Sequence, residues 1–378
     1  MTKERYIGIM SGTSFDAVDV VLCEIDKTSC TLISALEYPM PLELKSDILS
    51  MIDGKTTLEL VGQLDYRLGL LFTQAVGALL IRESIDASSI TAIGSHGQTL
   101  WHAPNGEYPF SIQLGDANII TAKIGIPVVA DFRRKDVALC GQGAPFAPAF
   151  HEFIFSNINA SISVINIGGM ANITVLANNI NDKLIGYDTG CGNVLLDMWI
   201  NKHQNVSYDK DGAWAKSGEV NYTLLDAMMA DDYISLDYPK STGREKFNEA
   251  WLNSILGCTS TSSVNTIVDS VTELVEVVKA QDVQRTLVEL TALSISNEVL
   301  KFNTDVALLC GGGAKNSFLV ERIKALMPNV EVAIAQNADE IEAMTFAWLA
   351  YKRIHKEVVN LKDVTGASEN AVLGCVYL

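Results

Sequence analysis

The chain has 378 residues, more than the roughly 100–200 residues of one typical domain, so we expect two domains of ordinary size. Apolar residues make up 48% and charged residues only 19%, a balance that excludes an intrinsically disordered chain. Lysine and arginine total 28 against 45 acidic residues, and the resulting formal charge of −17 would repel a phosphate backbone. We therefore expect a globular protein that does not bind nucleic acid.

The N-terminal residues Met1–Tyr6 lack the continuous apolar region of a secretory signal. No stretch approaches the roughly 18 consecutive apolar residues of a membrane-spanning helix. The seven cysteines form no Cys-x-x-Cys pair, which argues against a disulfide framework and against a zinc site. We predict a cytoplasmic protein with reduced thiols, no structural metal and no membrane partner.

The first predicted elements are three strands rich in Ile and Val, at residues 5–10, 18–25 and 31–37. A small polar segment, Ser11–Ser14, joins the first two strands as a turn. The chain then has helical periodicity and short apolar runs, which predict helices at 42–53 and 59–84 and strands at 91–94 and 127–130. Strands therefore come first and later alternate with helices.

A second round of elements begins near residue 161. A strand at 161–167 runs into Gly168-Gly169 and a second strand at 171–176, which predicts a hairpin with a glycine turn. Residues 164–169 resemble residues 7–12, about 155 residues earlier, as a duplicated domain would produce. The elements predicted to complete this second lobe are a strand at 184–187, helices at 193–203 and 282–301, a strand at 305–309, and helices at 316–327 and 339–355. The Ser- and Thr-rich residues 257–265 predict a mobile surface loop.

Four glycine-rich turns each follow an apolar strand: Ser11–Asp16, Gly168-Gly169, Gly190–Gly192 and Gly311–Gly313. Glycine lets a phosphate approach the main chain, and successive backbone N–H groups bind anions. The P-loop and Gly-x-Gly-x-x-Gly patterns are absent, and each turn taken singly is better explained as an ordinary tight connection. The combination of four turns with nearby aspartates indicates a phosphate site.

Two further groups of residues carry candidate chemistry. Asp188 ends an apolar strand next to Thr189 and Gly190, where a carboxylate can orient magnesium or take a proton from a nucleophile. Ser95–Thr99 offers imidazole, amide and hydroxyl groups suited to a sugar, although His96 alone equally fits a histidine satisfied within the fold. A Ser-His-Asp hydrolase is disfavoured because the chain has no Gly-x-Ser-x-Gly sequence.

Residues Gly8–Asp19 read Gly-Ile-Met-Ser-Gly-Thr-Ser-Phe-Asp-Ala-Val-Asp and closely resemble the opening motif of anhydro-N-acetylmuramic acid kinases. Similar segments continue in order along the chain: Gly94–Thr99, Asp131–Arg134, Gly141–Pro145, Asn166–Gly169, Asp188–Gly190, Pro239–Glu245, Cys310–Gly313 and Val364–Ala367. The resemblance therefore covers the whole chain.

This family belongs to the actin, sugar-kinase and heat-shock ATPase superfamily. The resemblance implies an α/β fold with two ribonuclease-H-like (actin-like ATPase) lobes, mixed sheets flanked by helices, and an ATP cleft between the lobes. We expect the N-terminal lobe at residues 1–135, with a tail at about 360–378 packed on it, and the C-terminal lobe at residues 136–359.

The resemblance also implies the roles of individual residues. Asp188 would be the catalytic base, and Asp16 would contact Mg²⁺. The residues implied to bind ATP are Gly12, Thr13, Ser14, Phe15, Asp16, Ala17, Val18, Asp19, Gly168, Gly169, Gly311, Gly312 and Gly313. Those implied to bind the sugar are His96, Gln98, Thr99, Arg133, Arg134 and Glu342, with one of the two arginines holding a carboxylate of the substrate.

The implied reaction is the ATP-dependent conversion of 1,6-anhydro-N-acetylmuramic acid and water into N-acetylmuramic acid 6-phosphate, by a homodimer that serves cell-wall recycling. One alternative is a kinase of the same superfamily for another hexose or amino sugar. Another, from a different class, is a chaperone or assembly ATPase of the actin type. Phe15, Ala17 and Cys191 depart from the Leu, Gly and Pro of the family pattern, and we expect activity to survive these changes.

Overall fold

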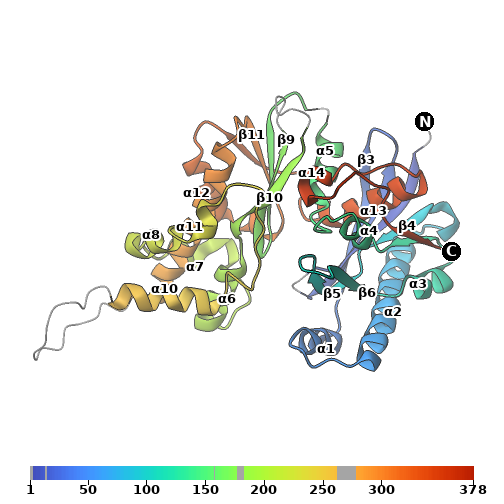
Figure 1. The fold of residues 1–378 in the computed structure, drawn as a ribbon, viewed down its shortest axis with the longest axis horizontal. Coiled ribbons are helices and arrows are strands. Elements are labelled where there is room, and N and C mark those ends of the chain that lie inside the picture. Colours follow the sequence, from blue (N-terminus) through green and yellow to red (C-terminus); the bar gives the residue numbers. More distant parts are fainter. Residues whose placement is uncertain (1–2, 13–14, 157, 177–182, 262–277) are drawn as a thin grey trace, which may run out of the picture. The chain divides into compact units, whose positions relative to one another are not determined.

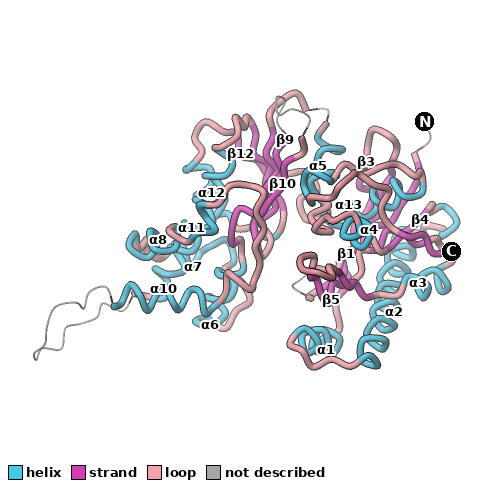
Figure 2. The backbone as a smooth tube through the Cα atoms, in the orientation of Figure 1, coloured by secondary structure: helices cyan, strands magenta, loops and turns pink. Residues whose placement is uncertain are grey.

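The computed structural model describes residues 3–12, 15–156, 158–176, 183–261 and 278–378. They divide into two compact units (Figure 1): unit 1 is Met1–Ile158 with Glu340–Leu378, and unit 2 is Asn159–Asp339. Each unit has its own mixed β-sheet flanked by helices, which Figure 2 shows with strands in magenta and helices in cyan. The predicted α/β class with mixed, helix-flanked sheets is confirmed.

Unit 1 is built on a six-stranded sheet with the order β13-β7-β4-β1-β2-β3. Its strands are β1 (Glu4–Met10), β2 (Ala17–Ile25), β3 (Cys30–Pro39), β4 (Ala92–Ser95), β7 (Val128–Ala130) and β13 (Cys375–Tyr377). Strand β2 pairs antiparallel with β1 and β3, whereas β1, β4 and β7 run parallel. The C-terminal residues return to this sheet as edge strand β13, antiparallel to β7.

The helices of unit 1 are α1 (Leu42–Ile52), α2 (Leu58–Glu83), α3 (Ala117–Ile124), α4 (Arg133–Ala138), α5 (Ala147–Phe155), α13 (Ile341–Ile354) and α14 (Lys362–Thr365). Helix α2 begins after Thr57, whose side chain accepts a hydrogen bond from the Leu60 N–H. Contrary to expectation, α2 is long and apolar enough to cross a membrane, the one such helix among the described residues. Half of the most apolar 18 residues of this helix are buried inside the structure. Leu68 and Phe72 on this helix belong to the core of unit 1, as in an ordinary core helix.

Helix α13 packs directly on the sheet of unit 1 because both strands beneath it carry glycine. Gly8 on β1 and Gly94 on β4 are register partners. A Cβ atom at Gly8 would collide with the backbone of Ala343, and one at Gly94 with the backbone of Phe346. This close approach places α13 in unit 1, which corrects the prediction that the helix at 339–355 closes the second lobe.

The boundary between the units also differs from the prediction. It falls at residues 158/159 and 339/340, not at 135/136 and 359/360. Helix α13 contacts β1 and β4, and α5 contacts α13, so the residues flanking both predicted boundaries pack within unit 1. The hairpin of β5 (Gln98–Ala103) and β6 (Phe110–Leu114), which was not predicted, also belongs to this unit.

Unit 2 repeats the strand order of unit 1 in a five-stranded sheet, β10-β9-β8-β11-β12. Its strands are β8 (Ile162–Ile167), β9 (Met170–Leu176), β10 (Ile185–Cys191), β11 (Val306–Cys310) and β12 (Glu331–Ile334). Strand β9 pairs antiparallel with β8 and β10, while β8, β11 and β12 run parallel. In sequence order this is 3-2-1-4-5, the same as β3-β2-β1-β4-β7 in unit 1, so the two units share one ribonuclease-H-like topology.

The helices of unit 2 are α6 (Val194–Gln204), α7 (Ala213–Lys216), α8 (Tyr222–Met229), α9 (Asp232–Ser235), α10 (Glu249–Thr261), α11 (Ala280–Leu300) and α12 (Ser317–Leu326). Helix α10 corrects the prediction of a loop at 257–265, because residues 257–261 continue the helix. Its preceding residues Trp251, Ile255 and Leu256 pack against the core and anchor it. Residues 262–265 of the predicted loop lie outside the described residues.

Candidate active site

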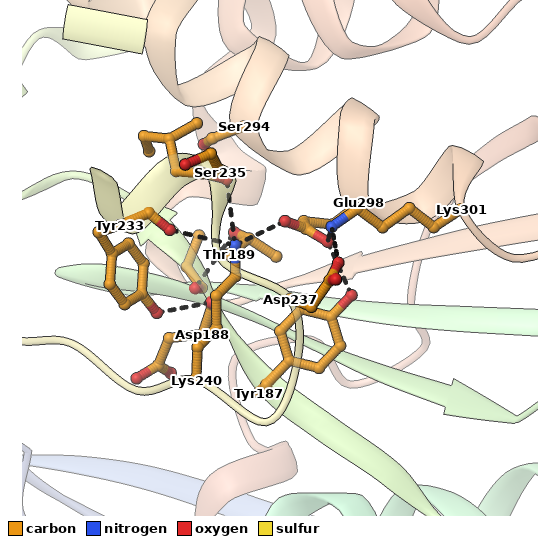
Figure 3. Close-up of polar contacts among 12 residues, drawn as sticks. Tyr187, Asp188, Thr189, Tyr233, Ser235, Asp237, Lys240, Ser294, Glu298 and Lys301 are labelled. Atoms are coloured by element: carbon orange, nitrogen blue, oxygen red, sulfur yellow. Dashed lines mark hydrogen bonds and ion pairs between the residues drawn. The ribbon is translucent and has the colours of Figure 1, made fainter. Parts of the chain in front are cut away.

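Asp188 lies on β10 where the pairing with β9 is irregular. The register shifts between Asp188 and Gly190, as in a β-bulge. The Asp188 N–H donates to the Lys240 carbonyl at 3.2 Å, and its carbonyl accepts from Tyr233 Oη at 2.8 Å (Figure 3). A bulge changes the direction of the side chain that it carries and is common beside functional sites. Here the N–H and the carbonyl of Asp188 are both held by hydrogen bonds, so the backbone at the irregularity is fixed.

The carboxylate of Asp188 is held through one of its oxygens. Oδ2 accepts hydrogen bonds from Ser241 Oγ and from the Thr242 N–H, each at 3.0 Å, whereas no hydrogen bond to Oδ1 is found among the described residues. Burial raises the pKa of Asp188, and the charge of Glu245 adds to this rise, while the two hydrogen bonds oppose it. A carboxylate with a raised pKa and one oxygen available is suited to accept a proton.

The three predicted glycine turns of unit 2 meet at one end of its sheet. The N–H groups of Gly192 and Asn193 donate to the carbonyls of Gly169 and Gly168, at 2.9 and 2.8 Å. The turn after β11 starts at Gly311 with a φ of +76°, and a Cβ atom there would collide with the end of β8. The glycines thus let the three turns approach one another more closely than residues with a Cβ atom would permit. Main-chain groups of such turns can contact an anion.

Two residues beside these turns were missed by the sequence analysis. Asn193 Nδ2 donates to the carbonyl of Ile167 at 3.1 Å and so links the start of α6 to β8. The guanidinium of Arg244 lies 3.9 Å from where a Cβ atom of Gly169 would be, and it is exposed. Arg244 belongs to the segment Pro239–Glu245, whose resemblance to the family was the available signal.

In unit 1 the predicted phosphate segment Gly12–Asp19 links β1 to β2. Phe15 adopts a φ of +55° and its N–H donates to the Gly12 carbonyl at 3.4 Å. Ala17 is already part of β2 and has no positive φ, so its departure from the family's glycine strains nothing. The segment's other members are Thr13 and Ser14, which lie outside the described residues, exposed Asp16, and Val18 and Asp19 on β2.

His96 and Arg133 form the polar centre of the predicted sugar site in unit 1. Arg133 donates to His96 Nε2 at 2.8 Å and to the Gly143 carbonyl at 2.8 Å. Burial lowers the pKa of His96 well below its usual value, and the charge of Arg133 acts in the same direction. Burial also lowers the pKa of Arg133 to about 10, although the charges of Glu342 and Asp136 oppose this. His96 is therefore a neutral acceptor, and Arg133 stays cationic at neutral pH.

The other predicted sugar residues of unit 1 differ in their surroundings. Gln98 is buried and accepts from Ser11 Oγ at 2.6 Å, which ties the hairpin β5–β6 to the end of β1. Thr99 Oγ1 accepts from Gln113 Nε2 at 3.2 Å. Arg134 is exposed and forms an ion pair with Asp131 at 2.7 Å, so its charge already has a partner.

A pocket of about 520 Å³ opens in unit 1 beside this cluster. His96 and Arg134 line it together with Ser95, Asp116, Asp131 and Tyr377. Gln98, Thr99, Arg133 and Glu342 do not line it. His96 thus contacts Arg133, on which the charge of Glu342 acts, and it also lines the pocket that Arg134 faces.

A family model for anhydro-N-acetylmuramic acid kinase matches residues 4–378. The chain belongs to the anhydro-N-acetylmuramic acid kinase family. An anhydro-N-acetylmuramic acid kinase of Sulfurovum sp. is 64% identical over 378 residues, which are 100% of both chains. One from Sulfurimonas denitrificans is 47% identical over 379 residues, covering 99% of this chain and 100% of its own length. One from Vibrio cholerae is 48% identical over 383 residues, covering 99% and 98%.

Two solved structures also align with this anhydro-N-acetylmuramic acid kinase family member. The activator of 2-hydroxyisocaproyl-CoA dehydratase from Clostridium difficile, with bound ADPNP, has a TM-score of 0.46 at 13% identity and covers 97% of this chain and 100% of its own. A ROK family glucokinase from Streptomyces griseus, in complex with glucose and AMPPNP, has a TM-score of 0.41 at 13% identity. The alignment covers 92% of this chain and 99% of the glucokinase chain.

The predicted family and the prediction of a kinase are confirmed by the full-length matches. The alternatives, a kinase for another sugar and an actin-type chaperone or assembly ATPase, are not favoured, because the relatives cited above are all named for the anhydro sugar.

A magnesium site in this kinase family member would centre on Asp16. Its carboxylate is exposed and lies 2.6 Å from Lys45 Nζ. Within the described parts of the chain, no group of three or more His, Cys, Asp or Glu residues is arranged to hold a metal. Mg²⁺ is usually bound by one or two carboxylates together with substrate phosphates and water, so Asp16 would supply one ligand and would give up its ion pair with Lys45 to do so.

Proposed function

We propose that the protein converts 1,6-anhydro-N-acetylmuramic acid, ATP and water into N-acetylmuramic acid 6-phosphate and ADP. In this reaction the oxygen of water bonds to the anomeric carbon while its proton passes to Asp188. The bond between the anomeric carbon and O6 breaks, and its electron pair stays on O6. O6 then forms a bond to the γ-phosphorus of ATP, and the bond to ADP breaks.

The observation that carries this proposal is the environment of Asp188. Its Oδ2 is fixed by Ser241 and Thr242, which leaves Oδ1 to face a water. Burial raises the pKa of the carboxylate, so it holds a proton more readily than an exposed aspartate does. No acid is needed for the leaving oxygen, because phosphoryl transfer to O6 neutralises its charge as the ring bridge opens.

Glycine-rich segments are proposed as the phosphate-binding groups, as the family resemblance implies. In unit 2 these are Gly168-Gly169 and Gly311–Gly313, with Arg244 as an added cation. In unit 1 the segment is Gly12–Asp19, with Asp16 as the ligand of Mg²⁺. Bound Mg²⁺ supplies positive charge that offsets the negative charge of the phosphates.

The lactyl carboxylate of the sugar is assigned to Arg133 and not to Arg134. Arg133 donates to two neutral acceptors, His96 and the Gly143 carbonyl, and its planar guanidinium is suited to bind a carboxylate. Arg134 is already paired with Asp131. Gln98, Thr99 and Glu342 are proposed as further contacts to the sugar hydroxyl and amide groups.

The reaction is tested by mass spectrometry of the products formed from ATP, Mg²⁺ and the anhydro sugar in oxygen-18 water. We expect a sugar 6-phosphate that carries one heavy oxygen at the anomeric carbon. The Asp188→Asn variant should form this product at least about 1,000-fold more slowly, since it cannot take the proton. Full activity of this variant would remove Asp188 from the mechanism.

The same assay separates the proposed activity from that of another superfamily kinase. Free N-acetylmuramic acid and glucosamine are offered as phosphoryl acceptors in place of the anhydro sugar. Efficient phosphorylation of either, with no reaction of the anhydro sugar, would favour direct transfer to a sugar hydroxyl. A cytoplasmic homodimer stays a prediction from the family resemblance, and sedimentation of the purified protein tests the dimer.

A further inference from the structure

A buried ion pair lies behind Asp188 in unit 2. Lys240 Nζ is 2.7 Å from Glu298 Oε1, and the two side chains are only 2% and 3% exposed (Figure 3). Removing two charges from water opposes folding, and a well-packed apolar pair of similar volume is often at least as stable. The pair therefore calls for a reason other than stability.

Glu298 connects both chain segments that surround Asp188. Its Oε1 binds Lys240, and its Oε2 accepts from the hydroxyl of Tyr187, the residue before Asp188, at 2.9 Å. Lys301, the residue that follows the end of α11, adds an ion pair to Oε2 at 2.8 Å. One carboxylate on a core helix thus ties β10 and the segment Lys240–Thr242 to the same point.

Lys240 connects this ion pair to Asp188 through the main chain. Its carbonyl accepts the Asp188 N–H, and the next two residues hold the Asp188 carboxylate. Its Nζ lies 3.4 Å from the carbonyl of Tyr233, whose hydroxyl in turn binds the Asp188 carbonyl. Both ends of Lys240 therefore act on groups that contact Asp188.

We propose that the Lys240–Glu298 ion pair is a positioning device, which fixes the segment Lys240–Thr242 so that Ser241 and Thr242 hold one oxygen of Asp188 and aim the other. Neither residue contacts the reacting atoms. The inference rests on the proposed role of Asp188 as the base and adds to it the residues that orient the base. A pair with a purely structural role would affect folding but not the chemistry of Asp188.

The test is the Glu298→Gln variant, which keeps the size of the side chain and removes its charge. We expect kcat to fall at least ten-fold while KM for ATP and for the anhydro sugar changes less than two-fold. We also expect the acid limb of the kcat–pH profile to move to higher pH, because loosened Ser241 and Thr242 hold the charged carboxylate less well. Tyr233 and Glu245 also face Asp188 and are unchanged in this variant.

Glu289→Gln is the matched control on the same helix. Glu289 forms ion pairs with Arg285 at 2.8 Å and with Arg322 at 2.9 Å, and its side chain is 8% exposed. We expect this variant to lose thermal stability as Glu298→Gln does, with kcat and its pH profile unchanged. Equal kinetic effects in the two variants would overturn the proposal.

A double variant keeps the test decisive if Glu298→Gln does not fold. Lys240→Met with Glu298→Met removes both charges at similar volume, so it leaves no uncompensated charge in the core. We expect a folded protein with lowered kcat and the shifted acid limb, and unchanged kinetics would overturn the proposal. If Asp188→Asn is fully active, the proposed function itself fails. If that variant is inactive and Glu298→Gln is normal, only the positioning role fails.

Discussion

Units 1 and 2 have the same strand order, and each holds a partly buried charged side chain among its predicted site residues: Arg133 in unit 1 and Asp188 in unit 2. Arg133 donates to an imidazole and a carbonyl, and Asp188 accepts from a hydroxyl and a backbone N–H. In each case neutral groups hold the charge. By contrast, the fully buried charge of Lys240 is neutralised by Glu298. The Lys240–Glu298 pair is therefore assigned a role within the protein itself, whereas Arg133 and Asp188 are assigned to the substrate and the reaction.

The units also differ in how their central parallel strands are covered. In unit 1 the register partners Gly8 and Gly94 let the α13 backbone approach the sheet directly. In unit 2 the central parallel pair has Ile165 and Leu309 as register partners, both buried, and side chains fill the layer above the sheet. Unit 1 thus adds a close backbone contact between helix and sheet to the side-chain packing that both units have.

The largest effect is expected from Gly94→Val, which would end the close packing in unit 1. A Cβ atom at this position meets the Phe346 backbone of α13, which cannot rotate away. We expect the free energy of unfolding to fall by at least about 3 kcal/mol, the upper end of overpacking costs. Urea unfolding followed by tryptophan fluorescence measures it. The control, Gly77→Ala in α2, has open space around it and should stabilise the helix by up to about 1 kcal/mol.

The next effect separates the two neighbouring arginines of unit 1. We expect Arg133→Met to raise KM for the anhydro sugar by roughly 10–100-fold, the value of a charge-assisted hydrogen bond, with KM for ATP unchanged. The Arg133→Lys variant should have a KM for the anhydro sugar between those of the unchanged protein and of Arg133→Met, because lysine keeps the charge but lacks the planar guanidinium. Arg134→Met is the control and should change KM less than three-fold. A larger effect at Arg134 than at Arg133 would reverse the assignment.

Acid should destabilise unit 1 through His151, which is fully buried on α5. Burial lowers the pKa of His151 from 6.5 to about 3, so below pH 6.5 the unfolded state binds a proton that the folded state does not. Stability is therefore lost as the pH falls from 6.5 towards 3, by about 2 kcal/mol at pH 5. In His151→Phe this part of the pH dependence should vanish. Phe155→Leu, which alters a neighbouring ring without removing a titrating group, should retain it.

Much of the fold could be predicted, because strands such as residues 18–25 and 161–167 are rich in Ile and Val and are bounded by polar or glycine turns. The hairpin β5–β6 could not, since Gln98–Ala103 mixes polar and aromatic residues and lies partly in solvent. The prediction that the helix at 339–355 belongs to the second lobe was wrong for another reason. A helical pattern says that one face is buried but not which sheet covers it, and only the paired glycines Gly8 and Gly94 carried that information.

The candidate site divides in the same way. Asp188 and the glycine turns follow apolar strands, a local pattern that a sequence displays. Lys240 and Glu298 are 58 residues apart, and their pairing depends on the packing of α11 beneath β10. No local pattern marks such a pair, so it emerged only from the three-dimensional structure, although the resemblance had already singled out the segment Pro239–Glu245.

The smallest effect is expected from Ala17→Gly, which restores the glycine of the family pattern in unit 1. Ala17 lies in β2 opposite Pro39 and has no positive φ, so glycine is not required there. The substitution should lower the free energy of unfolding by about 0.5–1 kcal/mol through added freedom of the unfolded chain. Because the strand holds the backbone in place, KM for ATP should change less than two-fold. A marked gain in ATP affinity would mean that the turn before β2 must adopt a conformation, when nucleotide is bound, that alanine resists.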